Sequence, residues 1–188
     1  MKRIFIAVKT EPGPELNAMV SFFKRALNNE KIKWSEFANM HITLVFLGDT
    51  DELKIRVIDK LLKELCSDFQ SFSFRISGAG VFRNMKDPRV IWAGITETEK
   101  LKELNSIILS ALREKDIVTE ERDFSPHLTL GRIKNISDTE ILKRSVESFR
   151  NKSFQIVNVS EIILYESILR PEGPLYKPLG KYPLLPEA

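Results

Sequence analysis

The only two histidines of the chain each open the same four-residue pattern. His41 begins "HITL", and His127 begins "HLTL". Side chains alternate across a β-strand, so His41 shares a face with Thr43, and His127 shares a face with Thr129. The two Cα atoms of such a pair lie about 6.7 Å apart, which lets both side chains touch one phosphate group. One motif alone is more typical of a buried strand than of a functional site, but the repeated motif favours a functional site.

Two histidines and two threonines suit displacement at phosphorus. One imidazole can accept a proton while the other donates one, because the pKa of imidazole lies near neutral pH. Threonine hydroxyls can hydrogen-bond the non-bridging oxygens of a phosphate held between them. In-line attack needs a base behind the attacking group and an acid behind the leaving oxygen. A pseudo-twofold arrangement of the two motifs would supply both.

Other kinds of site fit the sequence less well. A zinc site needs further His, Cys or carboxylate ligands at close spacing, and Asp49 and Asp51, which are near His41 in the sequence, are expected in the loop after its strand. A serine hydrolase of the nucleophile-elbow type would carry G-x-S-x-G, which the sequence lacks. No metal and no cofactor are therefore expected.

The pattern of apolar residues predicts alternating strands and helices. Strands are expected over residues 3–10, 31–37, 41–47, 72–82, 89–96 and 123–133 and within 154–169, helices over 14–30, 53–65, 101–112 and 138–150, and a Pro- and Gly-rich tail at the end. Each His-x-Thr strand comes after one helix and before another, which indicates a diverged internal repeat. The sequence therefore predicts an α+β fold of two pseudo-symmetric lobes, each an antiparallel sheet with helices.

Composition indicates an ordinary globular protein. Of the 188 residues, 43% are hydrophobic and 29% are charged, and the net charge is +3. No apolar run of 18 residues exists, so no membrane span is expected. The N-terminal apolar stretch is too short for a signal peptide. Cys66 is the only cysteine and falls in a helical pattern, which predicts a core residue and a cytoplasmic location.

These motifs are part of a wider resemblance that spans almost the whole chain. It includes "RIFIAV", "NMHITLVFLG", "PRVIWAG", "FSPHLTLGRI" and "LYESILRPEGPLY". The paired motifs resemble those of the two-histidine phosphoesterases. Within that superfamily the chain resembles the RNA 2′,3′-cyclic phosphodiesterases, long called 2′–5′ RNA ligases.

The resemblance implies one bilobal domain over residues 1–188, with the active site in the cleft between the lobes. It also implies metal-independent opening of a 2′,3′-cyclic phosphate to a 2′-phosphate. In the reverse sense, a 5′-hydroxyl would attack the cyclic phosphate and form a 2′–5′ bond. The expected partners are RNA ends with a 2′,3′-cyclic phosphate, among them tRNA fragments, or small nucleotides. A monomer is expected.

Residue roles carried over from the family fall on both motifs. His41 and His127 become the acid–base pair, with His41 as acid and His127 as base, and Thr43 and Thr129 hold the phosphate. Arg132, five residues past His127, matches an arginine that approaches the phosphate.

Phe46 lies at the same offset from His41 and matches an aromatic residue near the base. Strict alternation places both Phe46 and Arg132 on the wrong face of their strands, so a bulge or a turn at the strand end is required in each.

Two other functions remain open. A non-catalytic module that captures RNA phosphate ends would keep the threonines and Arg132 but would not need both histidines. An enzyme with the same site could act on a different cyclic phosphate, such as one on ADP-ribose. Trp34, Trp92, Tyr165 and Tyr176 are expected to be structural, and Arg83, Lys86 and Arg89 form a basic loop that could meet RNA.

Overall fold

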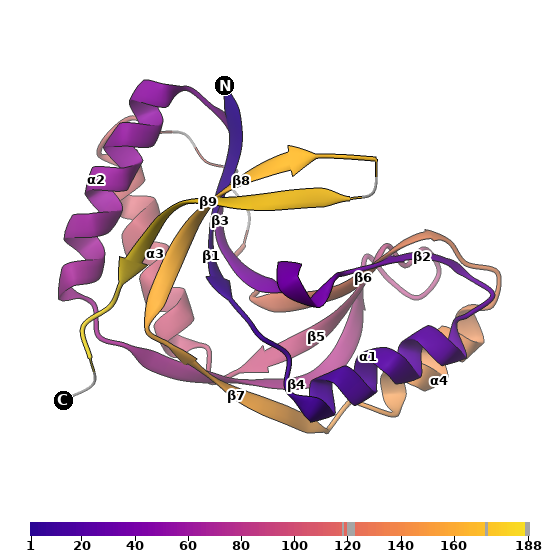
Figure 1. Cartoon of the computed structure of the whole chain (residues 1–188). Coiled ribbons are helices and arrows are strands. Elements are labelled where there is room, and N and C mark those ends of the chain that lie inside the picture. Colours follow the sequence, from indigo (N-terminus) through magenta and orange to yellow (C-terminus); the bar gives the residue numbers. More distant parts are fainter. Residues whose placement is uncertain (118, 120–122, 172, 187–188) are drawn as a thin grey trace.

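Figure 1 shows the computed structural model of the chain, which describes residues 1–117, 119, 123–171 and 173–186. The strands are β1 (Lys2–Lys9), β2 (Lys31–Trp34), β3 (His41–Thr50), β4 (Phe72–Phe82), β5 (Val90–Thr96), β6 (His127–Asn135), β7 (Ser153–Val159), β8 (Glu161–Leu169) and β9 (Pro174–Pro183). The helices are α1 (Pro14–Ala26), α2 (Glu52–Asp68), α3 (Glu99–Arg113) and α4 (Thr139–Glu147), with a short 3₁₀ turn at Phe37–Asn39.

The named strands form two antiparallel sheets. Sheet 1 has the order β3-β1-β8-β9, and sheet 2 has the order β2-β6-β5-β4-β7. The two His-x-Thr strands occupy matching places, because β3 lies beside β1 and β6 lies beside β5, in each case the strand that precedes the intervening helix. The predicted α+β class with antiparallel sheets is confirmed.

The helices are exchanged between the sheets (Figure 1). α1 precedes β3 in the chain but packs with α4 against sheet 2, through β7 and β4. α3 precedes β6 but packs with α2 against sheet 1, through β3 and β9. Each helix before a His-x-Thr strand therefore supports the sheet of the other motif.

Sheet 1 is packed on both faces. Alternation along β1 turns Ile4, Ile6 and Val8 towards the helices and the main core. Phe5 and Ala7 turn the other way, into a small second cluster that also includes residues of β8 and β9. We call this second side of sheet 1 its cleft face, because His41 lies on it.

Several boundary predictions were wrong. The strand expected over residues 31–37 ends at Trp34, and the helix expected over residues 14–30 ends at Ala26. The expected Pro- and Gly-rich tail contains a full strand, β9, paired along its length with β8. Prolines are tolerated there because β9 is an edge strand, whose outer N–H groups need no partner in the sheet. The strand expected from residue 123 begins only at His127. No helix within the described residues is long and apolar enough to cross a membrane.

Candidate active site

His41 and His127 are the first residues of β3 and β6, and both are half-buried. The Nδ1 atom of His41 lies 2.7 Å from the carbonyl oxygen of Asn39, and Nδ1 of His127 lies 2.8 Å from that of Ser125. A carbonyl oxygen only accepts, so each Nδ1 carries the proton and donates it. The same anchor, two residues upstream, therefore leaves Nε2 of each ring available for proton transfer.

A β-bulge follows the His-x-Thr pair in β3. Thr43 pairs with Ala7 on β1, and Phe46 pairs with Phe5. Three steps along β3 thus match two along β1, and Leu44 is the extra residue. The bulge places Phe46 on the same face as Thr43, which strict alternation would not do for a residue five positions past His41.

The same bulge occurs in β6. Thr129 pairs with Trp92 on β5, and Arg132 pairs with Val90, so Leu130 is the extra residue. Arg132 therefore lies on the face of Thr129, and its side chain is exposed. The irregularity expected from the offset of five residues is a bulge in both motifs.

In each bulge, the carbonyl group of the extra residue accepts a hydrogen bond from a residue outside the β1–β3 or β5–β6 strand pair. The carbonyl oxygen of Leu44 accepts a 2.8 Å hydrogen bond from Nδ2 of Asn105, a buried residue of α3. The carbonyl oxygen of Leu130 accepts a 2.8 Å bond from the backbone N–H of Ser35, just past β2. Neither contact could be read from the sequence, because both donors lie far from the motifs in the chain.

Aromatic rings surround His41. The rings of Phe5 and Tyr176 each lie 5.0 Å from it between centroids, and Tyr176 meets it edge-on. Phe46 extends the group at 6.1 Å from Phe5 and is 47% exposed. Tyr176, expected to be structural, therefore packs against a candidate catalytic ring.

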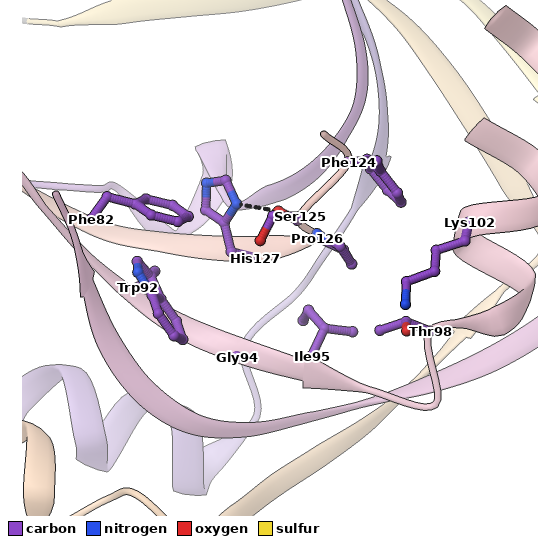
Figure 2. A pocket seen from close by; sticks show the side chains of 10 residues that line it. All are labelled: Phe82, Trp92, Gly94, Ile95, Thr98, Lys102, Phe124, Ser125, Pro126 and His127. Atoms are coloured by element: carbon purple, nitrogen blue, oxygen red, sulfur yellow. Dashed lines mark hydrogen bonds between the residues drawn. The ribbon is translucent and has the colours of Figure 1, made fainter. Parts of the chain in front are cut away.

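Figure 2 shows the surroundings of His127. Phe82 meets the imidazole edge-on, with 4.5 Å between centroids, and Trp92 lies 5.5 Å from Phe82. A cavity of about 310 Å³ opens beside them, and Thr98 and Lys102 of the α3 segment line its other side. Trp92, expected to be a core residue, is half-buried and lines this cavity.

Charges couple the two motifs. Burial lowers the pKa of His41 and of His127, and the Arg132 guanidinium lowers the pKa of both further. The hydrogen bonds to Asn39 and Ser125 act in the opposite direction. His127 also lowers the pKa of His41, and β3 contacts β6 although the two strands belong to different sheets. The structure thus brings both histidines and Arg132 within electrostatic reach of one another.

Other candidates behave differently. Cys66 is buried, and burial raises the pKa of its thiol to about 12, as suits a core residue. In the basic loop, Asp87 pairs with both Arg83 and Arg89, which offsets part of the positive charge of the loop.

Among the described residues no group of three His, Cys, Asp or Glu side chains is arranged to hold a metal ion.

Comparison with known proteins identifies the family. The model for LigT-like phosphoesterases matches residues 6–92 and 94–176, two consecutive segments with one His-x-Thr strand each. This chain belongs to the LigT-like phosphoesterase family. The two matched segments agree with the internal repeat expected from the sequence.

Relatives within the LigT-like family match over most of their length. The RNA 2′,3′-cyclic phosphodiesterase of Methanothermobacter thermautotrophicus is 33% identical over 176 residues, which cover 93% of this chain and 94% of the relative. The enzyme of the same name from Thermotoga maritima is 33% identical over 177 residues, covering 94% and 92%.

Solved structures of other proteins share the fold. A protein of Thermus thermophilus superposes with a TM-score of 0.80 and 26% identity, covering 99% of this chain and all of the other. E. coli LigT in complex with 3′-AMP gives a TM-score of 0.74 at 21% identity, covering 97% and 98%.

Proposed function

We propose that this protein is an RNA 2′,3′-cyclic phosphodiesterase that opens the cyclic phosphate to a 2′-phosphomonoester. Its family and the names of its relatives support cyclic phosphodiesterase activity. The proposal for the site rests on two structural features that both His-x-Thr motifs share. Both histidines are anchored through Nδ1 two residues upstream, and both strands bulge directly after the threonine.

The proposed reaction uses the free Nε2 atoms of His41 and His127. One histidine, neutral at the start, removes a proton from a water molecule as its oxygen attacks phosphorus. The other, protonated at the start, donates its proton to O3′ as the P–O3′ bond breaks. The products are a free 3′-hydroxyl and a 2′-phosphate, and proton exchange with water restores both imidazoles. We assign His41 as acid and His127 as base on the family resemblance.

Thr43, Thr129 and Arg132 are proposed to hold the phosphate. Each threonine lies two residues past its histidine on the same face, about 6.7 Å away along the strand, so its hydroxyl can reach a non-bridging oxygen. The Arg132 guanidinium can donate two parallel hydrogen bonds to the phosphate and is charged at every physiological pH. Phe46, exposed on the cleft face, is proposed to contact the nucleotide base.

The same arrangement would also support ligation. A 5′-hydroxyl in place of water would attack phosphorus and lose its proton to the base, while the acid donates a proton to O3′. The result is a 2′–5′ linkage beside a free 3′-hydroxyl. RNA ends, including tRNA fragments, are the proposed substrates. All groups required by the proposal are protein side chains, so no metal is invoked.

Incubation with adenosine 2′,3′-cyclic phosphate in excess EDTA, followed by product identification, tests the proposal. We expect adenosine 2′-phosphate as the product and the same rate with and without EDTA. A 3′-phosphate product, or activity only with added Mg²⁺, would contradict the assigned chemistry. Binding of RNA ends without any turnover would instead indicate a capture module.

A further inference from the structure

A second cavity, of about 220 Å³, opens beside His41 on the cleft face of sheet 1. Its lining includes the two residues that precede His41, just as the cavity beside His127 includes the two residues that precede His127. It is smaller than typical sites for drug-sized ligands, which are about 300–1,000 Å³. Its size and its place next to one histidine suit a single nucleoside attached to the reacting phosphate.

Tyr165 gives this cavity a polar group without a protein partner. The residue is only 8% exposed, and its ring stacks on Phe5 with 5.3 Å between centroids. The hydroxyl of Tyr182 donates to Asp59, whereas that of Tyr165 has no hydrogen bond to any described residue. The hydroxyl oxygen of Tyr165 is not among the buried polar atoms that lack a partner, so it is open to solvent and can donate to a ligand group in the cavity.

Two lysines lie at the same cavity, one from each side of Tyr165. Side chains alternate along β1, so Lys9 lies on the same face of that strand as Phe5. Lys181 of β9 pairs with Ile163 of β8, and both lysines line the cavity. Lys9 forms an ion pair of 2.9 Å with Glu11, and Lys181 forms one of 3.5 Å with Glu161.

Both ion pairs are solvent-exposed, and exposed pairs of this kind contribute little stability. An incoming phosphate can therefore compete with each carboxylate for its lysine. Two ammonium groups beside a nucleoside-sized cavity match an RNA strand, in which one ribose separates neighbouring phosphates.

We propose that the cavity beside His41 holds the nucleoside that bears the cyclic phosphate, and that Lys9 and Lys181 bind the phosphate on its 5′ side. The substrate is then the end of an RNA chain, and a free cyclic nucleoside phosphate is a poor substitute for it. This inference rests on the proposed function, because it names the substrate of the same site.

Two probes that differ by one phosphate test the inference. Adenosine 2′,3′-cyclic phosphate is compared with the same compound carrying a 5′-phosphate, and kcat/KM is measured for each. We expect the 5′-phosphate to raise kcat/KM on the order of tenfold, as a charge-assisted contact typically does. In a Lys9→Ala/Lys181→Ala variant the ratio of the two kcat/KM values is expected to fall towards one.

Controls separate this contact from general charge and from folding. Lys60→Ala removes a lysine of another exposed ion pair, on α2, and is expected to leave the ratio intact. Tyr165→Phe keeps the ring that packs on Phe5 and is expected to raise KM for both probes severalfold, because it removes only the hydroxyl.

Equal kcat/KM for the two probes in the parent protein would overturn the inference, as would a ratio that survives loss of both lysines. Either result leaves the proposed function standing, because the unphosphorylated probe is still hydrolysed. Absence of turnover with both probes would overturn the proposed function itself.

Discussion

Leu44 and Leu130 are the extra residues of two equivalent β-bulges, each one position past a His-x-Thr pair. The bulges place Phe46 and Arg132 on the faces that carry the histidines, where strict alternation would have turned them away. The carbonyl groups of the two leucines are held by donors from different parts of the chain, the Asn105 side chain and the Ser35 backbone. The local geometry of the site therefore depends on tertiary contacts made behind it.

Asn105→Leu tests the support of the first bulge. The substitution conserves approximate volume but leaves the Leu44 carbonyl without its donor in a buried place, which typically costs about 1–3 kcal/mol. We expect a lower free energy of unfolding in urea and a lower kcat, because the bulge orients Thr43 and Phe46. Ser106→Ala, at an exposed neighbour on α3, is the matched control and is expected to change neither quantity. Normal kcat in a folded Asn105→Leu protein would show that the bulge does not need this bond.

Arg132 is predicted to bind phosphate in both the ground state and the transition state. Arg132→Ala is expected to raise KM and to lower kcat, and Arg132→Lys to recover only part of the loss, because an ammonium group keeps the charge but not the planar fork. Steady-state kinetics with a cyclic nucleotide would measure both effects. Parent values of KM and kcat in Arg132→Ala would mean that this side chain does not reach the phosphate.

The pH dependence follows from the lowered histidine pKa values. One imidazole must be protonated and the other neutral, so kcat/KM is expected to depend on pH as a bell-shaped curve. The two limbs of the curve reflect the titration of the two coupled histidines. Burial and Arg132 hold both pKa values below the ordinary 6.5, so the optimum of kcat/KM is expected below pH 6.5. Removing the Arg132 charge raises both pKa values, and Arg132→Ala should move the optimum to higher pH. An optimum of kcat/KM above pH 7 in the parent would contradict this assignment.

The motifs and the helix faces followed from local patterns, which is why they were predictable. His41 and Thr43 share a face through simple alternation, and the offset of Phe46 required a bulge that the structure contains. Cys66 lies in the core as its helical spacing indicated. These features depend on neighbouring residues in the chain.

What the sequence could not supply depends on long-range packing. The exchange of α1 and α3 between the sheets is set by which apolar faces meet, and no local pattern encodes that choice. Tyr176 reaches His41 only because β9 pairs with β8, in a segment whose prolines indicated a tail. The exchanged helices support the proposal that residues 1–188 form one bilobal domain.

The pH–rate profiles of His41→Ala and His127→Ala test the central claim, that two histidines from two repeats form one acid–base pair. Each substitution is expected to lower the rate roughly 10²–10⁴-fold and to remove one limb of the bell, a different limb in each variant. The limb lost in each variant identifies the acid and the base, and the double variant is expected to be far less impaired than the product of the single effects. Loss of the same limb in both variants, or a full bell in either one, would contradict the account.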